Sequence, residues 1–185
     1  MKLIVGLGNP GNEYVDTRHN IGYSLLDYLC KDTNVVYRNK FNSNYVEVMI
    51  NGEKIILVKP LTYMNLSGIA VKNFVDFYKI DIDDILIIQD DLDMNLGKIK
   101  FVYDSSSGGH NGIKDIEKYL NTKKYLRLKI GISNDKNRDT KDYVLGKFNN
   151  EELKILNDSY YKLRDLFSDF VNLNKNELMS KYNNK

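Results

Sequence analysis

The sequence contains only one cysteine and two histidines. A single cysteine excludes an intrachain disulfide framework, and it also excludes a zinc ribbon or another multi-cysteine site. With two histidines, any metal site would need several carboxylates to complete it. The chemistry of this chain is therefore expected to rest on residue types other than cysteine.

Long hydrophobic runs are missing as well. The apolar run at the start, within MKLIVGLGNPG, is too short to span a bilayer and lacks the small-residue cleavage site of a secretory signal. No other stretch is long and apolar enough to cross a membrane. We therefore expect a soluble, cytoplasmic protein.

The composition is that of a folded domain. A length of 185 residues suits one ordinary core, and 42% hydrophobic with 28% charged residues is typical of a globular protein rather than a disordered one. There are no repeats, no proline-rich linker and no compositional break. We predict a single domain over residues 1–185.

Positive charge is concentrated in the middle of the chain. Residues 97–148 contain 12 Lys and Arg against 6 Asp and Glu, whereas residues 1–96 contain 9 against 13 and residues 149–185 contain 6 against 6. Such a basic block can mark a polyanion-binding surface. Lysines on solvated faces would give the same count, so charge alone leaves both interpretations open.

Strand-like and helix-like segments alternate along the chain. Helical spacing predicts a helix from Ile21 with Asn20 as its N-cap, and further helices over 66–77, 113–120 and 153–170. Apolar runs predict strands over residues 2–7, 85–88, 98–103 and 126–132, and Asn51-Gly52 predicts a hairpin joining 45–50 to 54–58. We therefore predict an α/β protein with a three-layer α/β/α architecture, in which helices cover both faces of a central mixed, twisted sheet.

The first turn contains a glycine pattern that resembles a nucleotide-binding motif. GLGNPG at residues 6–11 satisfies G-x-G-x-x-G after a predicted strand. In that motif the last glycine lies where a helix opens towards a pyrophosphate. Here a polar stretch intervenes, and Pro10 removes a backbone donor. A nicotinamide-dependent oxidoreductase is therefore a minor alternative, which titration with NAD(P)H would test.

Both histidines are followed by asparagine in polar surroundings, as His19-Asn20 and His110-Asn111. Taken singly, each is compatible with a surface or loop histidine. However, the acidic cluster QDDLD at residues 89–93 directly follows a predicted buried strand, and α/β proteins place their sites at such strand ends. A carboxylate there can hold an imidazole in its basic tautomer. A solvated turn is the alternative, and a calcium loop is a weak one because its ligand pattern is absent.

No protein nucleophile accompanies this His–Asp pair. The G-x-S-x-G pattern is absent, and Cys30 is expected to pack rather than react. The pair therefore favours water activated by a general base. Asn9, Asn65 and Asn111 offer uncharged donors and acceptors suited to a carbonyl or an oxyanion, although each can also be a cap or turn residue.

Four segments together resemble the bacterial-type peptidyl-tRNA hydrolases: KLIVGLGNPGNEYVDTRHNIG, KPLTYMNLSGIAV, QDDLDMNLGKIKF, and GGHNGIKDI with YLRLKIGI. They occur in the family's order, and the resemblance covers essentially the whole chain. It implies a monomeric α/β/α enzyme that hydrolyses the ester between a peptide and the 3′ end of tRNA, recycling tRNA from stalled ribosomes. It implies no metal and no organic cofactor.

The resemblance also implies residue roles. His19 would activate water, Asp90 would hold and polarise His19, and Asn9 would help to tell a blocked amino group from a free one. Asn65 would help to position the substrate and would also stabilise the oxyanion. Residues 109–120 would form a mobile lid, and the basic block would face tRNA phosphates. The substrate and tRNA would be bound by Tyr14, Tyr63, Asn65, His110, Asn111 and Lys129.

The sequence departs from the family pattern in three places. Gln89 stands where a histidine often precedes the aspartate, and Lys129 stands where an arginine often contacts phosphate. The stretch 104–107, DSSS, replaces a glycine-richer one. An RNA-binding protein of the same fold without hydrolytic activity is the main alternative, and the presence of all the site residues together argues against it.

Overall fold

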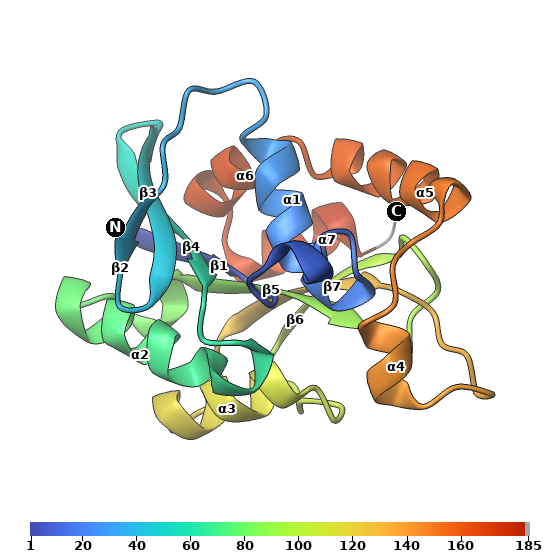
Figure 1. Ribbon diagram of the computed structural model, residues 1–185. Helices are drawn as coiled ribbons and strands as arrows, with labels where there is room; N and C mark the ends of the chain where they lie inside the picture. The colour runs from blue at the N-terminus through green and yellow to red at the C-terminus, as the bar shows by residue number, and fades with distance from the viewer. Residues whose placement is uncertain (184–185) are drawn as a thin grey trace.

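The computed structural model describes residues 1–183, which build one seven-stranded mixed sheet in the order β2-β3-β4-β1-β5-β7-β6 (Figure 1). Strands β4, β1, β5 and β7 are mutually parallel. Antiparallel pairs add β3 and β2 at one side and β6 at the other. The strands are β1 (Lys2–Gly6), β2 (Arg38–Lys40), β3 (Ser43–Ile50), β4 (Glu53–Pro60), β5 (Ile85–Asp91), β6 (Ile99–Tyr103) and β7 (Leu126–Gly131).

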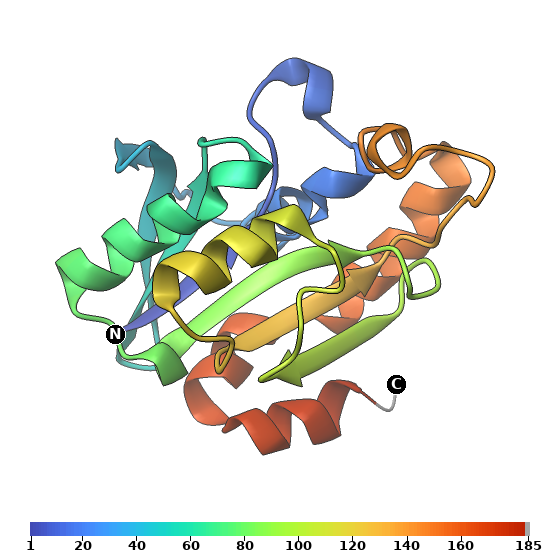
Figure 2. The ribbon, with the colours of Figure 1, turned by 90° about the horizontal axis from the view of Figure 1, so that it is seen from below.

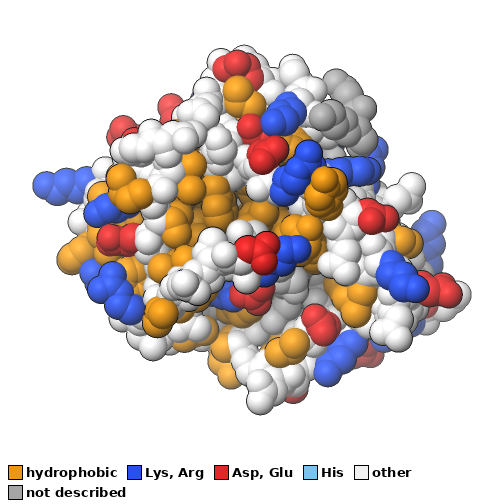
Figure 3. Space-filling view, turned by 90° about the horizontal axis from the view of Figure 1, so that it is seen from above, with side chains coloured by type: hydrophobic (Ala, Val, Ile, Leu, Met, Phe, Trp, Pro, Cys, Tyr) orange, Lys and Arg blue, Asp and Glu red, His pale blue; other side chains and the backbone are white. Residues whose placement is uncertain are grey.

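Helices cover both faces of this sheet, which confirms the three-layer prediction (Figures 1 and 2). On one face lie α1 (Ile21–Leu29), α5 (Asn150–Lys162) and α6 (Leu166–Asn172), and α7 (Lys175–Tyr182) packs against β6. On the other face lie α2 (Ser67–Tyr78) and α3 (Asn111–Leu120), which pack against each other. Seen from above, the α1 face shows hydrophobic side chains around a hollow, with charges of both signs near it (Figure 3).

The two layers of helices need two separate hydrophobic cores, and the central strands supply both. Along β1, Ile4 points into the core under α1, while Leu3 and Val5 point into the core under α2. Strand β5 divides its residues in the same way. Because both faces are covered, these strands have continuous apolar runs rather than alternating ones.

The predicted long helix over 153–170 is wrong, because the structure divides it. Helix α5 ends at Lys162 and α6 begins at Leu166, and the N–H of Leu166 donates to the carbonyl of Leu163 in a tight turn. Both leucines are fully buried. The apolar spacing therefore continues across the break and conceals it.

Three short elements were not predicted: β2, α4 (Thr140–Val144) and α7. Strand β2 and α4 are short and polar, so neither has a clear periodicity. Helix α7 does begin with a sequence signal, a capping box between Asn174 and Glu177. Among residues 1–183, no helix combines the length and apolar character needed to cross a bilayer.

The chain before α1 is held close to the ends of the central strands. A Cβ on Gly22 would lie 2.4 Å from the backbone nitrogen of Leu7 and 2.8 Å from the carbonyl oxygen of Ile88. Only glycine permits the first turn of α1 to approach β1 and β5 so closely. The turn before it, Arg18–Asn20, is thereby fixed beside the carboxyl end of β5.

Candidate active site

A cleft of about 1100 Å³ opens at the carboxyl ends of the parallel strands. Its walls come from the loop after β1, the segment before α2, the end of β5 and the start of α3. All nine predicted site residues line it: Asn9, Tyr14, His19, Tyr63, Asn65, Asp90, His110, Asn111 and Lys129. Sequence positions up to 120 residues apart thus meet in one cavity.

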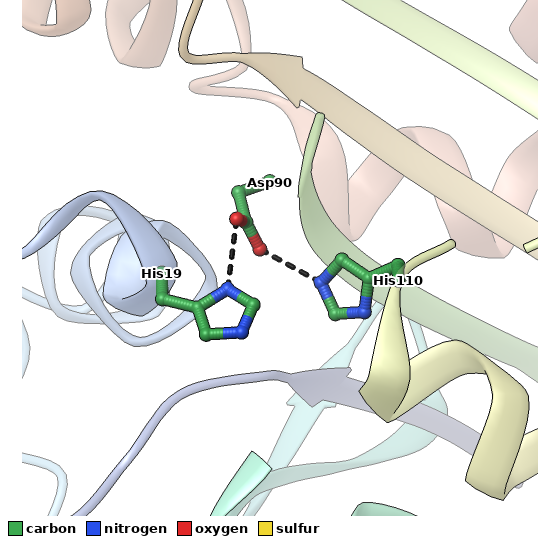
Figure 4. Close-up of side chains that lie close together, drawn as sticks. All are labelled: His19, Asp90 and His110. Carbon is green, nitrogen blue, oxygen red and sulfur yellow. Dashed lines mark hydrogen bonds and ion pairs between the residues drawn. The ribbon is translucent and has the colours of Figure 1, made fainter. Parts of the chain in front are cut away.

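Asp90 is the centre of the cleft, because both histidines of the chain bind its carboxylate (Figure 4). Nδ1 of His19 lies 2.8 Å from Oδ2, and Nε2 of His110 lies 2.8 Å from Oδ1. The Asp90 side chain is only 2% exposed. The contact between Asp90 and His19 is consistent with the predicted pair, whose catalytic roles stay predictions. The contact with His110, predicted only to bind substrate, was not foreseen.

The hydrogen bonds fix which ring nitrogens are protonated. Nδ1 of His110 accepts the backbone N–H of Ile113 at 3.3 Å, so its Nε2 must donate to Asp90. Because an ionised carboxylate only accepts, Nδ1 of His19 donates to it too. The Nε2 lone pair of His19 is then available for a proton from outside the pair.

Asp90 and His19 shift each other's pKa. Burial disfavours the charged carboxylate, but the two imidazoles outweigh burial and hold the pKa of Asp90 well below its usual value. Burial likewise lowers the pKa of His19, but the charge of Asp90 and its hydrogen bond reverse this and raise that pKa above 6.5. Asp90 is therefore ionised near neutral pH, and His19 is a stronger base than a free imidazole.

Asn9 is held in the cleft from two directions. Its Oδ1 accepts the backbone N–H of Met64 at 2.7 Å, which turns its amide NH₂ group away from that contact. Asn20 accepts the backbone N–H of Asn9 at 2.8 Å and donates to its carbonyl at 2.9 Å. Asn20 occupies the predicted N-cap position of α1, but its side chain makes no capping hydrogen bond and binds Asn9 instead.

Asn65 and Asn111 are exposed in the cleft wall, on two neighbouring segments that contact each other, and neither caps the helix that follows. The side chain that caps α3 is His110, while α2 begins without a side-chain cap. The rings of Tyr14 and Tyr63 meet edge to face with centroids 6.4 Å apart. Tyr63 has φ 63° and ψ 156°, a strained conformation for any residue except glycine, which the surrounding contacts must maintain.

Lysines line the side of the cleft formed by β6 and β7. Lys129 lies 2.6 Å from Oδ2 of Asp91, so part of its charge is already neutralised. Lys100 lies directly opposite Lys129 in the β6–β7 ladder. Sequence reasoning did not single out Lys100, since only the strand register shows that the two ammonium groups share one face. Lys141 lines the same cleft from α4.

A model of the family described as peptidyl-tRNA hydrolase matches residues 3–185. The chain belongs to this family. The peptidyl-tRNA hydrolase of Bacillus cereus (strain Q1) is 44% identical over 185 residues, covering 99% of this chain and 100% of the relative. That of Clostridium beijerinckii is 45% identical over 184 residues, covering 99% and 96%. A crystal structure of the Acinetobacter baumannii peptidyl-tRNA hydrolase matches with a TM-score of 0.86 and 36% identity, covering 99% and 94%.

Gln89, which departs from the peptidyl-tRNA hydrolase pattern, takes part in a buried contact that the sequence did not reveal. Its side-chain oxygen accepts from Arg127 at 2.6 Å. Arg127, 1% exposed, also donates to the carbonyls of Ser105 and Ser106 at 2.7 and 2.8 Å. Arg127 thus ties the loop that precedes His110 to β5, the strand that carries Asp90.

The lid over residues 109–120 stays a prediction, and the packing of this segment shows what its motion would involve. Most of this segment is helix α3, and its Ile113 and Ile116 are buried in the core shared with α2. A Cβ on Gly68 of α2 would lie 2.3 Å from the carbonyl oxygen of Asp115, so the two helices pack at close range. A flap that includes α3 would have to break this packing. The exposed part of the wall is the loop before α3.

His19, Asp90 and His110 are also the residues that could hold a metal ion, since their ligand atoms lie within 4.8 Å of one another. A metal would have to replace both hydrogen bonds to Asp90. It would also have to displace the proton on Nε2 of His110. That proton stays on Nε2 because Nδ1 accepts the backbone N–H of Ile113. The donor arrangement therefore suits proton transfer better than metal binding.

Proposed function

We propose that this chain hydrolyses the ester bond between the peptide and the 3′ end of tRNA in peptidyl-tRNA, with water as the nucleophile and His19 as the general base. Membership of the peptidyl-tRNA hydrolase family supports the reaction. The observation that supports the mechanism is the orientation of His19, whose Nδ1 is bound to Asp90 while its Nε2 is free.

In this mechanism Nε2 of His19 takes a proton from water as the oxygen attacks the ester carbonyl. The imidazolium is stabilised by the buried Asp90 carboxylate. The tetrahedral intermediate then collapses, the bond to the 3′ oxygen of the tRNA breaks, and His19 returns the proton to that oxygen. The products are free tRNA and a peptide carboxylic acid, which releases the second proton of the water to solvent, so no co-reactant besides water is needed.

The cleft amides would stabilise the developing charge and select the substrate. Asn65, exposed in the wall, supplies an uncharged donor for the oxyanion, and Asn111 positions the substrate from the neighbouring start of α3. The amide NH₂ of Asn9 can donate to the carbonyl of a peptide bond. A free ammonium group offers no such acceptor, so Asn9 would favour blocked over unblocked aminoacyl-tRNA.

The lysine side of the cleft would bind phosphates of the acceptor end. Lys100 and Lys129 lie opposite each other although like charges in that position repel. A bound phosphate would remove this repulsion, and such contacts position tRNA without reading its sequence. The rings of Tyr14 and Tyr63 provide surfaces for stacking on the terminal bases. We also propose that the enzyme acts as a monomer in the cytoplasm.

The experiment is release of free tRNA from N-acetylaminoacyl-tRNA, with unblocked aminoacyl-tRNA alongside, by the wild type and His19→Ala. We expect cleavage of the blocked ester only, lost in His19→Ala while tRNA affinity is largely kept. Binding of tRNA by the wild type without any cleavage would favour the RNA-binding alternative. Loss of both tRNA affinity and cleavage in His19→Ala would mean that His19 is structural.

A further inference from the structure

The exposed side of α2 presents apolar side chains that the fold does not use. Leu66, Ile69 and Phe77 are 57%, 42% and 59% exposed, and we call them the apolar stripe. Leu66 and Phe77 belong to the helical spacing that predicts this helix, but only Ala70 and Phe74 of that series are buried. The spacing of three and eight residues within the stripe places it on one side of the helix, with the half-buried Asn73 between Ile69 and Phe77.

The apolar stripe begins at the cleft. Tyr63, Met64 and Asn65 line the cleft wall, and Leu66 follows them in the same short helical turn before α2. Tyr63 is 54% exposed despite its strained backbone. An apolar surface thus continues from the cleft wall onto α2 without a charged residue between them.

The far end of the stripe is an aromatic cluster. Phe77 meets Phe41 and Tyr78 with ring centroids 5.4 and 4.9 Å apart, and the ammonium of Lys40 lies 4.3 Å from the Phe77 centroid. From Leu66 to Phe77 a helix rises about 17 Å. An extended peptide of about five residues has that length.

The lysines of the cleft gather away from α2. Lys100, Lys129 and Lys141 line the part formed by β6, β7 and α4, where Asp91 and Asp139 lie as well. Helices α2 and α4 lie at opposite sides of the fold (Figure 1). Beside the apolar stripe, Lys72 and Asp76 pair with each other at 2.8 Å. A substrate with a polyanionic part and a peptide part joined at an ester matches this division, with the ester beside His19.

We propose that the apolar stripe of α2 binds the peptide part of the substrate, in particular the residues upstream of the esterified one, and that it favours apolar side chains over about five residues. This inference rests on the proposed function. It adds a binding site for the peptide outside the cleft. None of the site residues that the resemblance implies belongs to the apolar stripe.

The test compares two substrates on one enzyme. One is N-acetylaminoacyl-tRNA, too short to leave the cleft, and the other is a hexapeptidyl-tRNA with leucine and valine side chains. For Ile69→Ser with Phe77→Ser, we expect KM for the long substrate to rise about three- to tenfold, since about two partly buried side chains are lost, with kcat unchanged. Kinetics on the short substrate should stay those of the wild type.

The matched control is Met49→Ser with Ile155→Ser, two exposed apolar residues on β3 and α5. This control should leave both substrates unaffected. Equal losses on both substrates in the α2 variant, or no loss on either, would overturn the proposal. So would a wild-type preference for a hexapeptide of serine and glutamine over the apolar one.

A binding measurement separates this inference from the proposed function. A fluorescently labelled leucine–valine hexapeptide, titrated without tRNA, should bind the wild type and His19→Ala alike and bind the α2 variant several-fold more weakly. Equal binding to all three would overturn the apolar stripe as a peptide site even if hydrolysis is intact. Sedimentation that shows a wild-type dimer lost in the α2 variant would instead assign the stripe to contact between copies.

Discussion

Asn20 closes two hydrogen bonds on the backbone of Asn9, accepting its N–H at 2.8 Å and donating to its carbonyl at 2.9 Å. Both residues are buried. Asn20 does not line the cleft, so it acts on the substrate only by orienting Asn9.

We therefore expect Asn20→Ala to lower the preference for blocked over unblocked aminoacyl-tRNA about tenfold, because Asn9 loses its fixed direction. Losing two buried hydrogen bonds should also cost about 1–3 kcal/mol of unfolding free energy. The measurement is kcat/KM on both substrates, with the exposed Asn12→Ala as the control. If Asn20→Ala lowers both values equally, its role is purely structural.

The charge of Asp90 is expected to set the pH dependence. His19 must be neutral to accept a proton, so wild-type kcat/KM should fall as pH drops through its pKa, which lies above 6.5. Asp90→Asn removes the charge that raises this pKa, so the acid limb should move to lower pH. The same change should reduce kcat about 10²- to 10⁴-fold, because the imidazolium loses its partner. An acid limb that stays in place would show that Asp90 does not govern His19.

Removing one lysine from the cleft should change the salt dependence of binding. We expect Lys100→Ala to raise KM more than it lowers kcat, and to reduce the slope of log affinity against log salt by about one. Lys129→Ala should have the larger effect on KM, because it also leaves Asp91 without its partner beside a polyanion. Lys154→Ala, exposed on α5, is the control. An unchanged slope in both cleft variants would contradict phosphate contacts here.

Arg127 is expected to support stability and catalysis by holding the loop that precedes His110. Arg127→Met leaves Gln89 and the carbonyls of Ser105 and Ser106 without their donor, so we expect a loss of about 2–4 kcal/mol in unfolding free energy. Because this loop leads into His110, kcat should fall as well. Denaturant unfolding and kcat together measure this, with the exposed Lys123→Met as the control. If Arg127→Met has the stability and kcat of the wild type, Arg127 does not hold this loop in place.

The sequence predicts the site best where polar residues directly follow a buried strand. The apolar run over 85–88 predicts a buried strand, and the acidic cluster after it predicts where a site lies, because strand ends in α/β proteins meet at one edge. The pattern predicts a His–Asp pair at this edge, and the resemblance to the family names Asp90 and His19 as its members. The single domain over residues 1–185 and the catalytic roles stay predictions.

Other features depend on contacts between distant segments, which no local pattern contains. Asn20 occupies the N-cap position of α1. Its side chain binds Asn9 only because the fold brings the loop after β1 next to it. Arg127 lies in an apolar strand, and its partners become evident only when β7 pairs with β5. The break between α5 and α6 was not predicted, because the buried leucines on both sides of it keep helical spacing.

The opposition of Lys100 and Lys129 has a consequence for the strand β6, which lies at one end of the sheet. Facing like charges weaken an antiparallel pair by a few tenths to about 1 kcal/mol. The ion pair of Lys129 with Asp91 offsets part of this repulsion, and the remainder weakens the hold on β6 in the free enzyme. An acceptor-end phosphate placed between the ammonium groups would reverse that balance. Amide hydrogen exchange along β6 should then slow when tRNA binds, so the strand would become rigid only while its substrate is in place.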